Sequence, residues 1–289
     1  FLKMLSILIP CYNYDIIELV KSISEQVKKT KKQYEIICVE DGSEKTFSNQ
    51  EIKSLKNTLY IQLKKNIGRS KIRNFLAKKA KYNWLLYIDC DSEIINEKFI
   101  QNYIRNIGNE HQIIHGTTKY QKNKPCDSKI LHWKYGIKIE SKRKKNIFSS
   151  HHFLIHKYTF EKIKFNENIK GYGHEDTIFW IELNKMNYKF KHIANPLNHI
   201  GLESNKKYID KTKNSIKNLF LLSEEYDLKK ISLIRTYKII SFLFLNHLLL
   251  FLFTCFEKKI MNNLLSAKPN LFIFQFFKIC YLCKIIKDY

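Results

Sequence analysis

Two carboxylates one residue apart follow a short apolar run in the first third of the chain. The run is Trp84 to Ile88, and the acids are Asp89 and Asp91. In an open α/β sheet, ligands bind beyond the carboxyl ends of the strands, and uncompensated charge buried there is costly. Mg²⁺ or Mn²⁺ would account for both acids, because such a cation takes one or two carboxylates together with phosphate oxygens and water. A turn in which Asp91 or Ser92 caps the next element would account for them as well.

Two more polar clusters follow apolar runs earlier in the chain. Pro10-Cys11-Tyr12-Asn13 comes after the run Met4–Ile9, and Glu40-Asp41-Gly42-Ser43 comes after Tyr34–Val39. Turn chemistry would explain one or two such clusters, but it does not readily explain acids after two separate strands. If the strands are parallel and their crossovers right-handed, all three clusters fall on one edge of the sheet.

The elements that must position these clusters alternate between strand and helix. This alternation predicts an α/β fold with a mostly parallel central sheet and helices on both faces. Asp15 is the expected cap of the first helix. The expected strands are Met4–Ile9, Tyr34–Val39, Leu59–Leu63, Trp84–Ile88, Phe148–Ile155 and Phe190–Ala194, and the expected helices are Ile16–Val27, Ser70–Ala80 and Thr177–Met186.

Composition narrows the class of protein. The net charge is +24, yet only five of the 51 basic residues are Arg. Specific nucleic-acid recognition favours Arg, so we expect no specific nucleic-acid partner and interpret the charge as a solvated coat that helps the chain meet anionic lipid or an anionic substrate. The seven Cys are scattered and odd in number, which indicates reduced thiols in the cytoplasm rather than a disulfide framework.

The last third of the chain is apolar in a different way. Residues 239–256 carry no charge and are flanked by Lys238 and by Lys258-Lys259. A spanning helix needs about 20 apolar residues, and Asn246 and His247 at the centre would be costly in lipid. We expect this run and Leu271–Ile286 to be helices that pack on the catalytic domain and lie on an anionic membrane surface. A true span and a soluble helical cap stay open as alternatives.

The N-terminal part does not resemble a secretion signal, because the apolar run Leu5–Ile9 is too short for one. We therefore expect a cytoplasmic protein, peripheral at the inner face of the cell membrane.

The motifs resemble those of family 2 glycosyltransferases, over roughly residues 4–200. The resemblance implies the GT-A fold and a nucleotide-diphosphate sugar as donor, so we expect a glycosyltransferase catalytic domain at 1–204. The helical, apolar and Lys-rich extension expected at 205–289 lies outside the resemblance. The residues that carry it are Ser6 to Asn13, Glu35 to Ser43, Asn66-Ile67-Gly68 with Arg73-Asn74, and Asp89-Cys90-Asp91.

On the donor side, the resemblance gives each matching residue a role. The turn containing Pro10, Tyr12 and Asn13 would lie against the nucleotide. Asp41 would accept a hydrogen bond from the base, typically uracil, and Arg73 would lie near the base and phosphates. Asp89 would approach the ribose or the metal, and Asp91 would bind the Mn²⁺ or Mg²⁺ that holds the diphosphate. Glu40 and Ser92 depart from the family pattern, since Asp is usual at the first position and frequent at the second.

On the acceptor side, Gly171-Tyr172-Gly173-His174-Glu175-Asp176 looks like the Gly-x-Gly-x-Glu-Asp segment of inverting, galactosyltransferase-like enzymes. Asp176 would then be the base and Glu175 would orient a glycan or lipid-linked acceptor. An ordinary helix cap is the alternative. His199 resembles a third metal ligand, although a structural role is open. We expect His151, His152 and His156 on a surface strand, and the alternative for His152 is a role in the acceptor pocket.

Other functions fit less well. A sugar nucleotidyltransferase would need a Gly-rich, Arg-containing loop after the first strand, and Pro10–Asn13 is not such a loop. The alternative from another class is a non-catalytic basic module that binds membranes or nucleic acid. The leading hypothesis is a metal-dependent inverting glycosyltransferase in surface polysaccharide synthesis.

Overall fold

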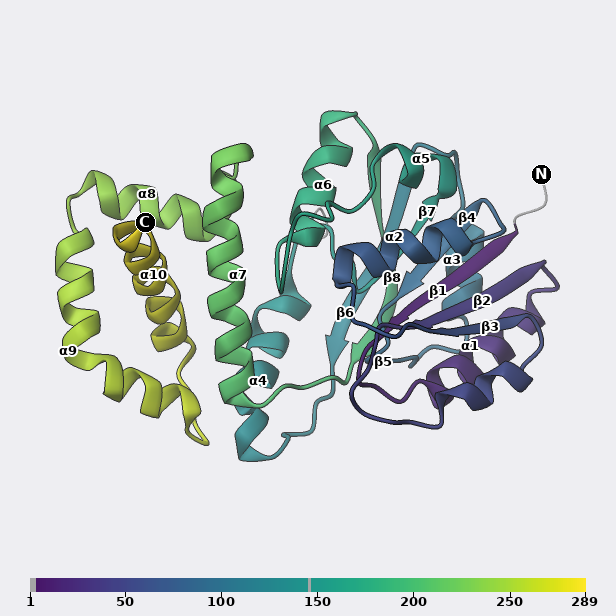
Figure 1. Cartoon of the computed structure of the whole chain (residues 1–289), viewed down its shortest axis with the longest axis horizontal. Coiled ribbons are helices and arrows are strands. Elements are labelled where there is room, and N and C mark those ends of the chain that lie inside the picture. The colour runs from purple at the N-terminus through teal and green to yellow at the C-terminus, as the bar shows by residue number, and fades with distance from the viewer. Residues whose placement is uncertain (1–3, 145–146) are drawn as a thin grey trace. The chain divides into compact units, whose positions relative to one another are not determined.

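The computed structural model describes residues 4–144 and 147–289 of the chain (Figure 1). The chain divides into two compact units. The first comprises Phe1–Gln121, Glu140–Ile169 and Glu175–Gly201, and the second comprises Lys122–Ile139, Lys170–His174 and Leu202–Tyr289. The division into a catalytic domain at 1–204 and an extension at 205–289 stays a prediction.

The first unit is built on a mixed sheet with strand order β3-β2-β1-β4-β7-β6-β8-β5. Strands β3, β2, β1 and β4 are parallel, β7 runs antiparallel to both β4 and β6, and β6 and β8 are parallel. The predicted mostly parallel α/β sheet is confirmed. The strands are β1 Leu5–Cys11, β2 Tyr34–Glu40, β3 Thr58–Gln62, β4 Trp84–Ile88, β5 Ser92–Glu93, β6 Gln112–Tyr120, β7 His152–His156 and β8 Lys189–His199.

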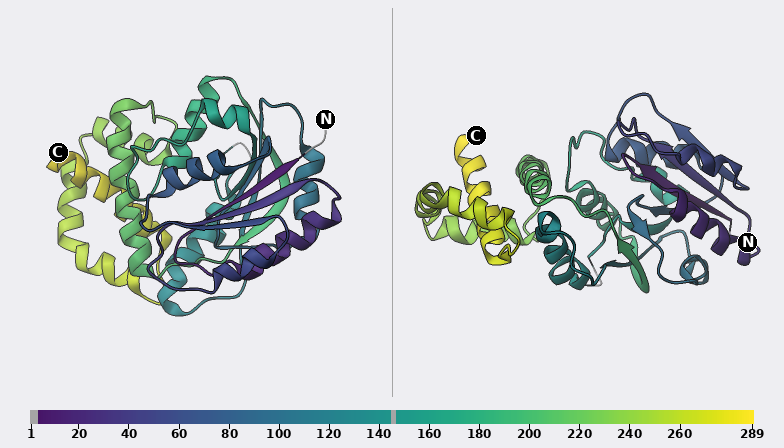
Figure 2. Two further views of the ribbon diagram at one scale, coloured as in Figure 1. Left: turned by 45° about the vertical axis from the view of Figure 1, so that its right-hand side comes forward. Right: turned by 90° about the horizontal axis from the view of Figure 1, so that it is seen from below.

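Helices cover both faces of this sheet (Figures 1 and 2). Alternate residues of β1 point to opposite faces, so Leu5, Ile7 and Ile9 pack with α1 and α3 while Leu8 packs with α2, α5 and α6. The expected cap, Asp15, stands one residue before the N-cap of α1, which is Ile16, although its Oδ1 accepts a hydrogen bond from the Ile17 N–H at 3.0 Å. The helices are α1 Ile17–Lys29, α2 Arg69–Lys79, α3 Phe99–Asn106, α5 Lys157–Lys162 and α6 Glu175–Lys185, with short 3₁₀ turns η1 Asn49–Ser54 and η3 Glu140–Lys142.

The expectation of a surface strand for the histidine cluster is wrong. Strand β7 lies inside the sheet between β4 and β6, and both of its faces are covered, because Leu154 packs in the core on one face while Phe153 and Ile155 pack in the core on the other. His152 is buried. His152 Nδ1 lies 2.7 Å from the Tyr103 hydroxyl. Alternation of His with apolar residues suggested one wet face, but the neighbours of a strand are set by topology and not by its own pattern.

The second unit is helical, and its core surrounds α10. Phe274 and Phe277 of α10 are buried, and the Phe274 ring lies 5.7 Å from that of Tyr208 on α7. Asn205 ties the unit together, because its side chain accepts from the Leu131 N–H at 2.9 Å and donates to the Asp127 carbonyl at 3.1 Å. The elements are η2 Asp127–Lys129, α4 Ile130–Lys138, α7 Asn205–Glu225, α8 Ser232–Phe242, α9 Asn246–Leu265 and α10 Leu271–Asp288.

The single helix expected over 239–256 is broken. Phe244 adopts φ 56°, the Leu245 N–H bonds to the Ile240 carbonyl, and the Phe244 N–H bonds to the Ser241 carbonyl. This is a Schellman end, which stops α8 and turns the chain into α9. Within the described residues, no individual helix has the length and apolar character of a membrane crossing, whereas α8 and α9 taken together reach it with a bend of 111° between them.

Candidate functional site

The polar clusters after β1 and β2 lie together at one edge of the sheet. Cys11 and Glu40 are paired at the ends of these two parallel strands. The Asp41 N–H donates to the Cys11 carbonyl at 2.8 Å, and the Asn13 N–H donates to Ser43 Oγ at 2.7 Å. Pro10 pairs with Val39 one residue before the end of β1, and Tyr12, which follows the strand, is exposed. The sequence therefore predicted correctly that these two loops meet.

Glu40 holds the loop from inside the fold. Its buried carboxylate accepts hydrogen bonds from the Tyr60 hydroxyl at 2.8 Å, from Asn49 Nδ2 at 3.0 Å and from the Ser43 hydroxyl. The longer Glu side chain is engaged by three separate donors, so this departure from the family pattern serves the architecture. No local sequence signal points to Asn49 or Tyr60, because both reach Glu40 from other elements.

Asp41 fixes the loop that precedes α2. Its buried carboxylate accepts from the backbone N–H groups of Ile67 at 2.7 Å and Gly68 at 3.1 Å. Burial raises the pKa of Asp41, and these two hydrogen bonds offset part of the rise. A carboxylate offers about four acceptor positions, so two bonds to the loop leave room for a base. Gly42 is required beside it, since its φ is +61° and a Cβ would lie 2.4 Å from the Asn66 backbone N.

The first acid after β4 forms a buried ion pair. Arg73 Nη2 lies 2.7 Å from Asp89 Oδ1, and the side chains are 3% and 23% exposed. Burial raises the pKa of Asp89, and the neighbouring Arg73 charge offsets part of that rise. Helix α2 carries Arg73, and the Tyr87 hydroxyl donates to the Arg73 carbonyl at 2.9 Å. Arg73 and Asp89, both predicted site residues, are thus brought together.

The second acid after β4 meets a histidine from β8. His199 Nε2 lies 3.6 Å from Asp91 Oδ2, because β5 and β8 pair with Ser92 opposite His199. The His199 ring stacks on His151 at 5.5 Å, and His151 in turn lies 3.0 Å from Ser92 Oγ and 3.1 Å from Thr118 Oγ1. Burial and the neighbouring imidazoles hold the pKa of His151 well below its ordinary value, so it is neutral.

The donor set at Asp91 fits a hard divalent cation in part. Among residues 4–144 and 147–289 no group of three or more His, Cys, Asp and Glu side chains is arranged to hold a metal. Asp91 and His199 offer one oxygen and one nitrogen to the same space. Two protein ligands suit Mg²⁺ or Mn²⁺ when substrate phosphates and water supply the remaining positions.

The two acids that begin α6 differ in burial. Glu175 is buried, and its Oε1 lies 3.4 Å from Arg69 Nη1. Burial raises the pKa of Glu175, but the Arg69 and Arg73 charges outweigh burial, so the pKa lies below its ordinary value. Asp176 is half-buried, and its Oδ1 accepts from Thr177 Oγ1 at 3.3 Å.

Arg69 is a functional candidate that the sequence reasoning missed. It stands one helical turn before Arg73 on α2, so this helix contacts both Asp89 after β4 and Glu175 at the start of α6. A usable signal existed: two of the chain's five Arg lie at i and i+4 on one helix.

In the second unit, the segment before α6 is held by α7. Asn218 Nδ2 donates to the carbonyls of Lys170 at 2.9 Å, Tyr172 at 3.2 Å and Gly173 at 3.3 Å. A Cβ on Gly173, whose φ is +105°, would lie 2.5 Å from Ser215 Oγ. Gly173 of the predicted acceptor segment therefore has a packing reason of its own, whereas nothing lies within 4 Å of a Cβ on Gly171.

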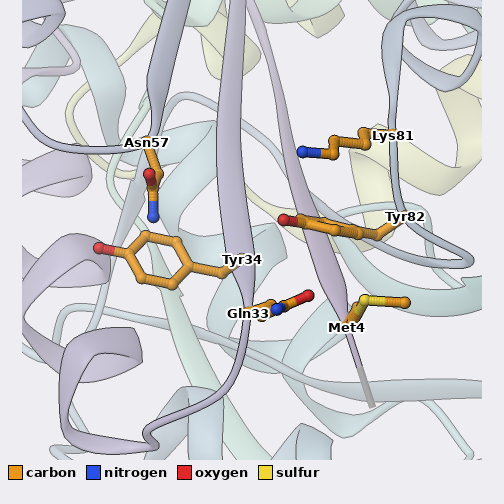
Figure 3. Close-up of a pocket in the computed structure, with 6 residues that line it drawn as sticks. All are labelled: Met4, Gln33, Tyr34, Asn57, Lys81 and Tyr82. Atoms are coloured by element: carbon orange, nitrogen blue, oxygen red, sulfur yellow. The ribbon is translucent and has the colours of Figure 1, made fainter. Parts of the chain in front are cut away.

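A pocket also lies at the opposite edge of the sheet (Figure 3). Its residues stand just before β1, β3 and β4 or at the beginning of β2, whereas the acids follow the ends of β2 and β4. Lys81 and Tyr82 point toward its centre from one side and Asn57 from the other. It does not include any predicted site residue. It is lined by Met4, Gln33, Tyr34, Asn57, Lys81 and Tyr82.

Comparison with known proteins gives a family match over the part of the chain that carries the acids after β2 and β4. Residues 6–169 match the model described as "Glycosyl transferase family 2". A chondroitin synthase of Escherichia coli is 34% identical over 104 residues, which is 35% of this chain and 15% of that protein. An uncharacterized glycosyltransferase of Haemophilus influenzae is 33% identical over 97 residues, 33% of this chain and 32% of that protein. The matches therefore span less than a third of either relative.

Solved structures confirm the predicted GT-A fold. S. aureus TarS 1–349 aligns with a TM-score of 0.50 at 19% identity, covering 74% of this chain and 64% of that one. A second TarS structure, in complex with UDP, gives the same TM-score at 20% identity and the same coverage. The mannosyltransferase PcManGT from Pyrobaculum calidifontis, in complex with GDP-Man and Mn²⁺, aligns with a TM-score of 0.53 at 11% identity, covering 76% and 64%.

Proposed function

Because the chain belongs to glycosyl transferase family 2, we propose that it is a metal-dependent inverting glycosyltransferase that uses a UDP-sugar. The acceptor in this proposal is a glycan or a lipid-linked sugar of a surface polysaccharide. One observation carries the proposal: α2 pairs its two Arg with Asp89 after β4 and with Glu175 at the start of α6. One helix therefore contacts both a residue suited to the donor and a residue suited to the acceptor.

The donor half offers groups that suit a nucleotide diphosphate. Asp41 keeps acceptor positions for a base N–H. Within the described part of the chain, Arg73 Nε is buried without a hydrogen-bond partner. Such a donor costs free energy until an acceptor reaches it, and a diphosphate or ribose oxygen is an acceptor of that kind. UDP bound to TarS, and GDP-Man with Mn²⁺ bound to the mannosyltransferase, make these the first ligands to test.

Asp91 and His199 are the residues proposed to hold the cation, with Asp89 beside them. A bound Mn²⁺ or Mg²⁺ would supply electrostatic stabilisation of the departing diphosphate. The neutral His151 supports this arrangement, because it stacks on the His199 ring and also contacts Ser92.

The two acids of α6 differ in their fitness as a base. Glu175 is paired with Arg69 and its pKa is lowered, so it binds a proton weakly. Asp176 is the better candidate, and a base must take the acceptor proton as the new bond forms. The acceptor oxygen attacks the anomeric carbon opposite the nucleotide, the bond from that carbon to the diphosphate breaks, and Asp176 receives the hydroxyl proton. Glu175 orients the acceptor.

The test measures nucleotide binding and transfer separately. UDP with Mn²⁺ should raise the melting temperature of the full chain, since a ligand stabilises the state that it binds. Asp91→Asn should abolish the metal-dependent part of that rise, and Asp176→Asn should keep it while losing sugar transfer. Asp227→Asn is the control, because its carboxylate is exposed in the second unit, where it lies 3.8 Å from Lys229 Nζ.

Two results would contradict the proposal. If neither UDP nor GDP stabilises the chain with or without Mn²⁺, the donor assignment fails. If the chain instead binds DNA with a steep salt dependence, the basic-module alternative gains support. An active Asp176→Asn variant would refute the base assignment alone.

A further inference from the structure

The junction of α8 and α9 presents large apolar side chains to solvent. We call residues Phe242–Leu245 the elbow. Phe242 is 81% exposed and Phe244 is 88% exposed, and Leu243 and Leu245 are exposed between and after them. In Figure 1 the elbow is the point where α8 turns into α9, and the two helices bend by 111° there. Four consecutive exposed apolar residues at a helix break need a partner to cover them.

Several backbone groups of the elbow are already hydrogen-bonded within the chain. The N–H groups of Leu243, Phe244 and Leu245 donate to carbonyls of α8 at 3.0 to 3.1 Å, and the Leu245 carbonyl accepts from the Leu249 N–H at 3.0 Å. A segment that enters lipid must satisfy its backbone groups internally, because hydrocarbon offers no partners. These three N–H groups and the Leu245 carbonyl meet this requirement without any change of conformation.

Helix α9 continues the apolar surface away from the elbow. Its inner face is buried, where the Phe253 ring lies 6.2 Å from that of Phe277 on α10. Its outer face exposes Leu248, Phe251 and Phe256. The helix is therefore apolar on both sides, although the core of its unit covers only one of them.

The charges around the apolar stretch indicate which kind of surface would cover the outer face of α9. Residues 232–256 contain no Asp or Glu. Exposed basic residues stand at both ends of the apolar stretch, and the only acid beside them is Glu257. An anionic surface that also accepts apolar side chains complements this arrangement. The basic residues are Arg235, Lys238, Lys258 and Lys259.

We propose that the elbow and the outer face of α9 dock on the surface of an anionic lipid bilayer, such as a cytoplasmic leaflet. Phe242 and Phe244 insert at the boundary between headgroups and acyl chains, and the basic residues at both ends contact lipid phosphates. The 111° bend turns each helix away from the insertion point, so the elbow enters the bilayer from one side and does not cross it. Asn246 and His247 follow the elbow directly and lie at headgroup level in this arrangement.

The experiment is flotation of the full chain with lipid vesicles. One set is phosphatidylcholine alone, and the other is phosphatidylcholine mixed with phosphatidylglycerol. The elbow variant Phe242→Ser/Phe244→Ser should lower partitioning by about tenfold or more, because two inserted aromatic side chains are lost. Lys258→Gln/Lys259→Gln should reduce the preference for the anionic vesicles. Phe272→Ser is the matched control, since Phe272 is 87% exposed but begins α10, away from the elbow.

Three results would overturn the proposal: a wild-type chain that floats with neither vesicle, an elbow variant that floats as well as wild type, or an elbow variant that turns a dimer into a monomer. The last would assign the surface to a second copy of the chain. Stabilisation by UDP and Mn²⁺ is measured on every variant. It should be unchanged, so that failure of membrane docking is distinguished from failure of the proposed catalytic function.

Discussion

The buried pair of Arg73 and Asp89 allows a quantitative test of the site. Arg73 Nη2 and Asp89 Oδ1 are 2.7 Å apart, and the Arg73 side chain is almost inaccessible to solvent. The guanidinium also packs on the Phe165 ring, with Cζ 5.5 Å from the ring centroid. The perturbation is a double-mutant cycle with Asp89→Asn, which keeps the shape and removes the charge, and Arg73→Met, which keeps the apolar stem.

The expected magnitude follows from burial. Removing one partner of a fully buried pair costs about 3–5 kcal/mol, because the other charge is left uncompensated. Asp89 retains 23% exposure, and an Asn oxygen can still accept from Arg73, so Asp89→Asn should cost about 2 kcal/mol. Arg73→Met should cost about 3 kcal/mol, since packing on Phe165 is also altered. The double variant should cost about 2 kcal/mol less than the sum, which is the coupling between the two side chains.

The assay is equilibrium unfolding in urea, followed by circular dichroism and by tryptophan fluorescence. Coincidence of the two probes is required before free energies are compared, because the chain contains two compact units. A coupling of less than about 0.5 kcal/mol would refute the reasoning. Such a result would mean that water, and not Arg73, stabilises the charge of Asp89. The contact between α2 and the residues after β4 would then add no stability to the fold.

Two further predictions concern the loops and the second unit. Gly42→Ala should destabilise the chain by more than about 2 kcal/mol, because its Cβ would clash with the Asn66 backbone. Gly68→Ala should cost only about 1 kcal/mol of backbone strain, because Gly68 has φ +91° but nothing lies within 4 Å of a Cβ there. Urea titrations of the two variants would measure the difference, and equal losses of stability would contradict the prediction. Burial raises the pKa of Glu203, but Lys211 and Lys207 outweigh burial and lower it below 4.5, so Glu203 adds stability above that pH and loses it as pH falls through the lowered pKa. Glu203→Gln should therefore melt below wild type at neutral pH and converge with it in acid, and a constant gap between the melting curves would argue against this pairing.

The positions of the strand ends could be predicted from the sequence, because they depend on short apolar runs and on the direction of the chain. Apolar runs separated by helical spacing imply parallel strands, and parallel strands place their following loops at one edge. Trp84–Ile88 was predicted with the bounds that β4 has. The meeting of Asn13 with Ser43 needed no further information than that rule.

The partners of these residues could not be predicted, because each comes from a distant element. Asn49 and Tyr60 reach Glu40, His151 reaches Ser92, and Glu175 reaches Arg69 only after the sheet has formed. The break at Phe244 was hidden for another reason. Left-handed helix ends are usually marked by Gly or Asn, and here the residue with φ 56° is a Phe inside an uninterrupted apolar run.

The charge of the site runs against the charge of the chain, and this bears on the metal. Although the net charge is +24, the side chains of the candidate site include more carboxylates than arginines. Each of the two Arg of α2 already faces an acid, at Asp89 or at Glu175. A nucleotide diphosphate brought beside Asp91 would add negative charge to negative charge, which is unfavourable in a partly buried space. A divalent cation, which Asp91 and His199 would hold, would reverse that sign. Donor binding should therefore require the cation itself and should not be replaced by raising the concentration of the nucleotide alone.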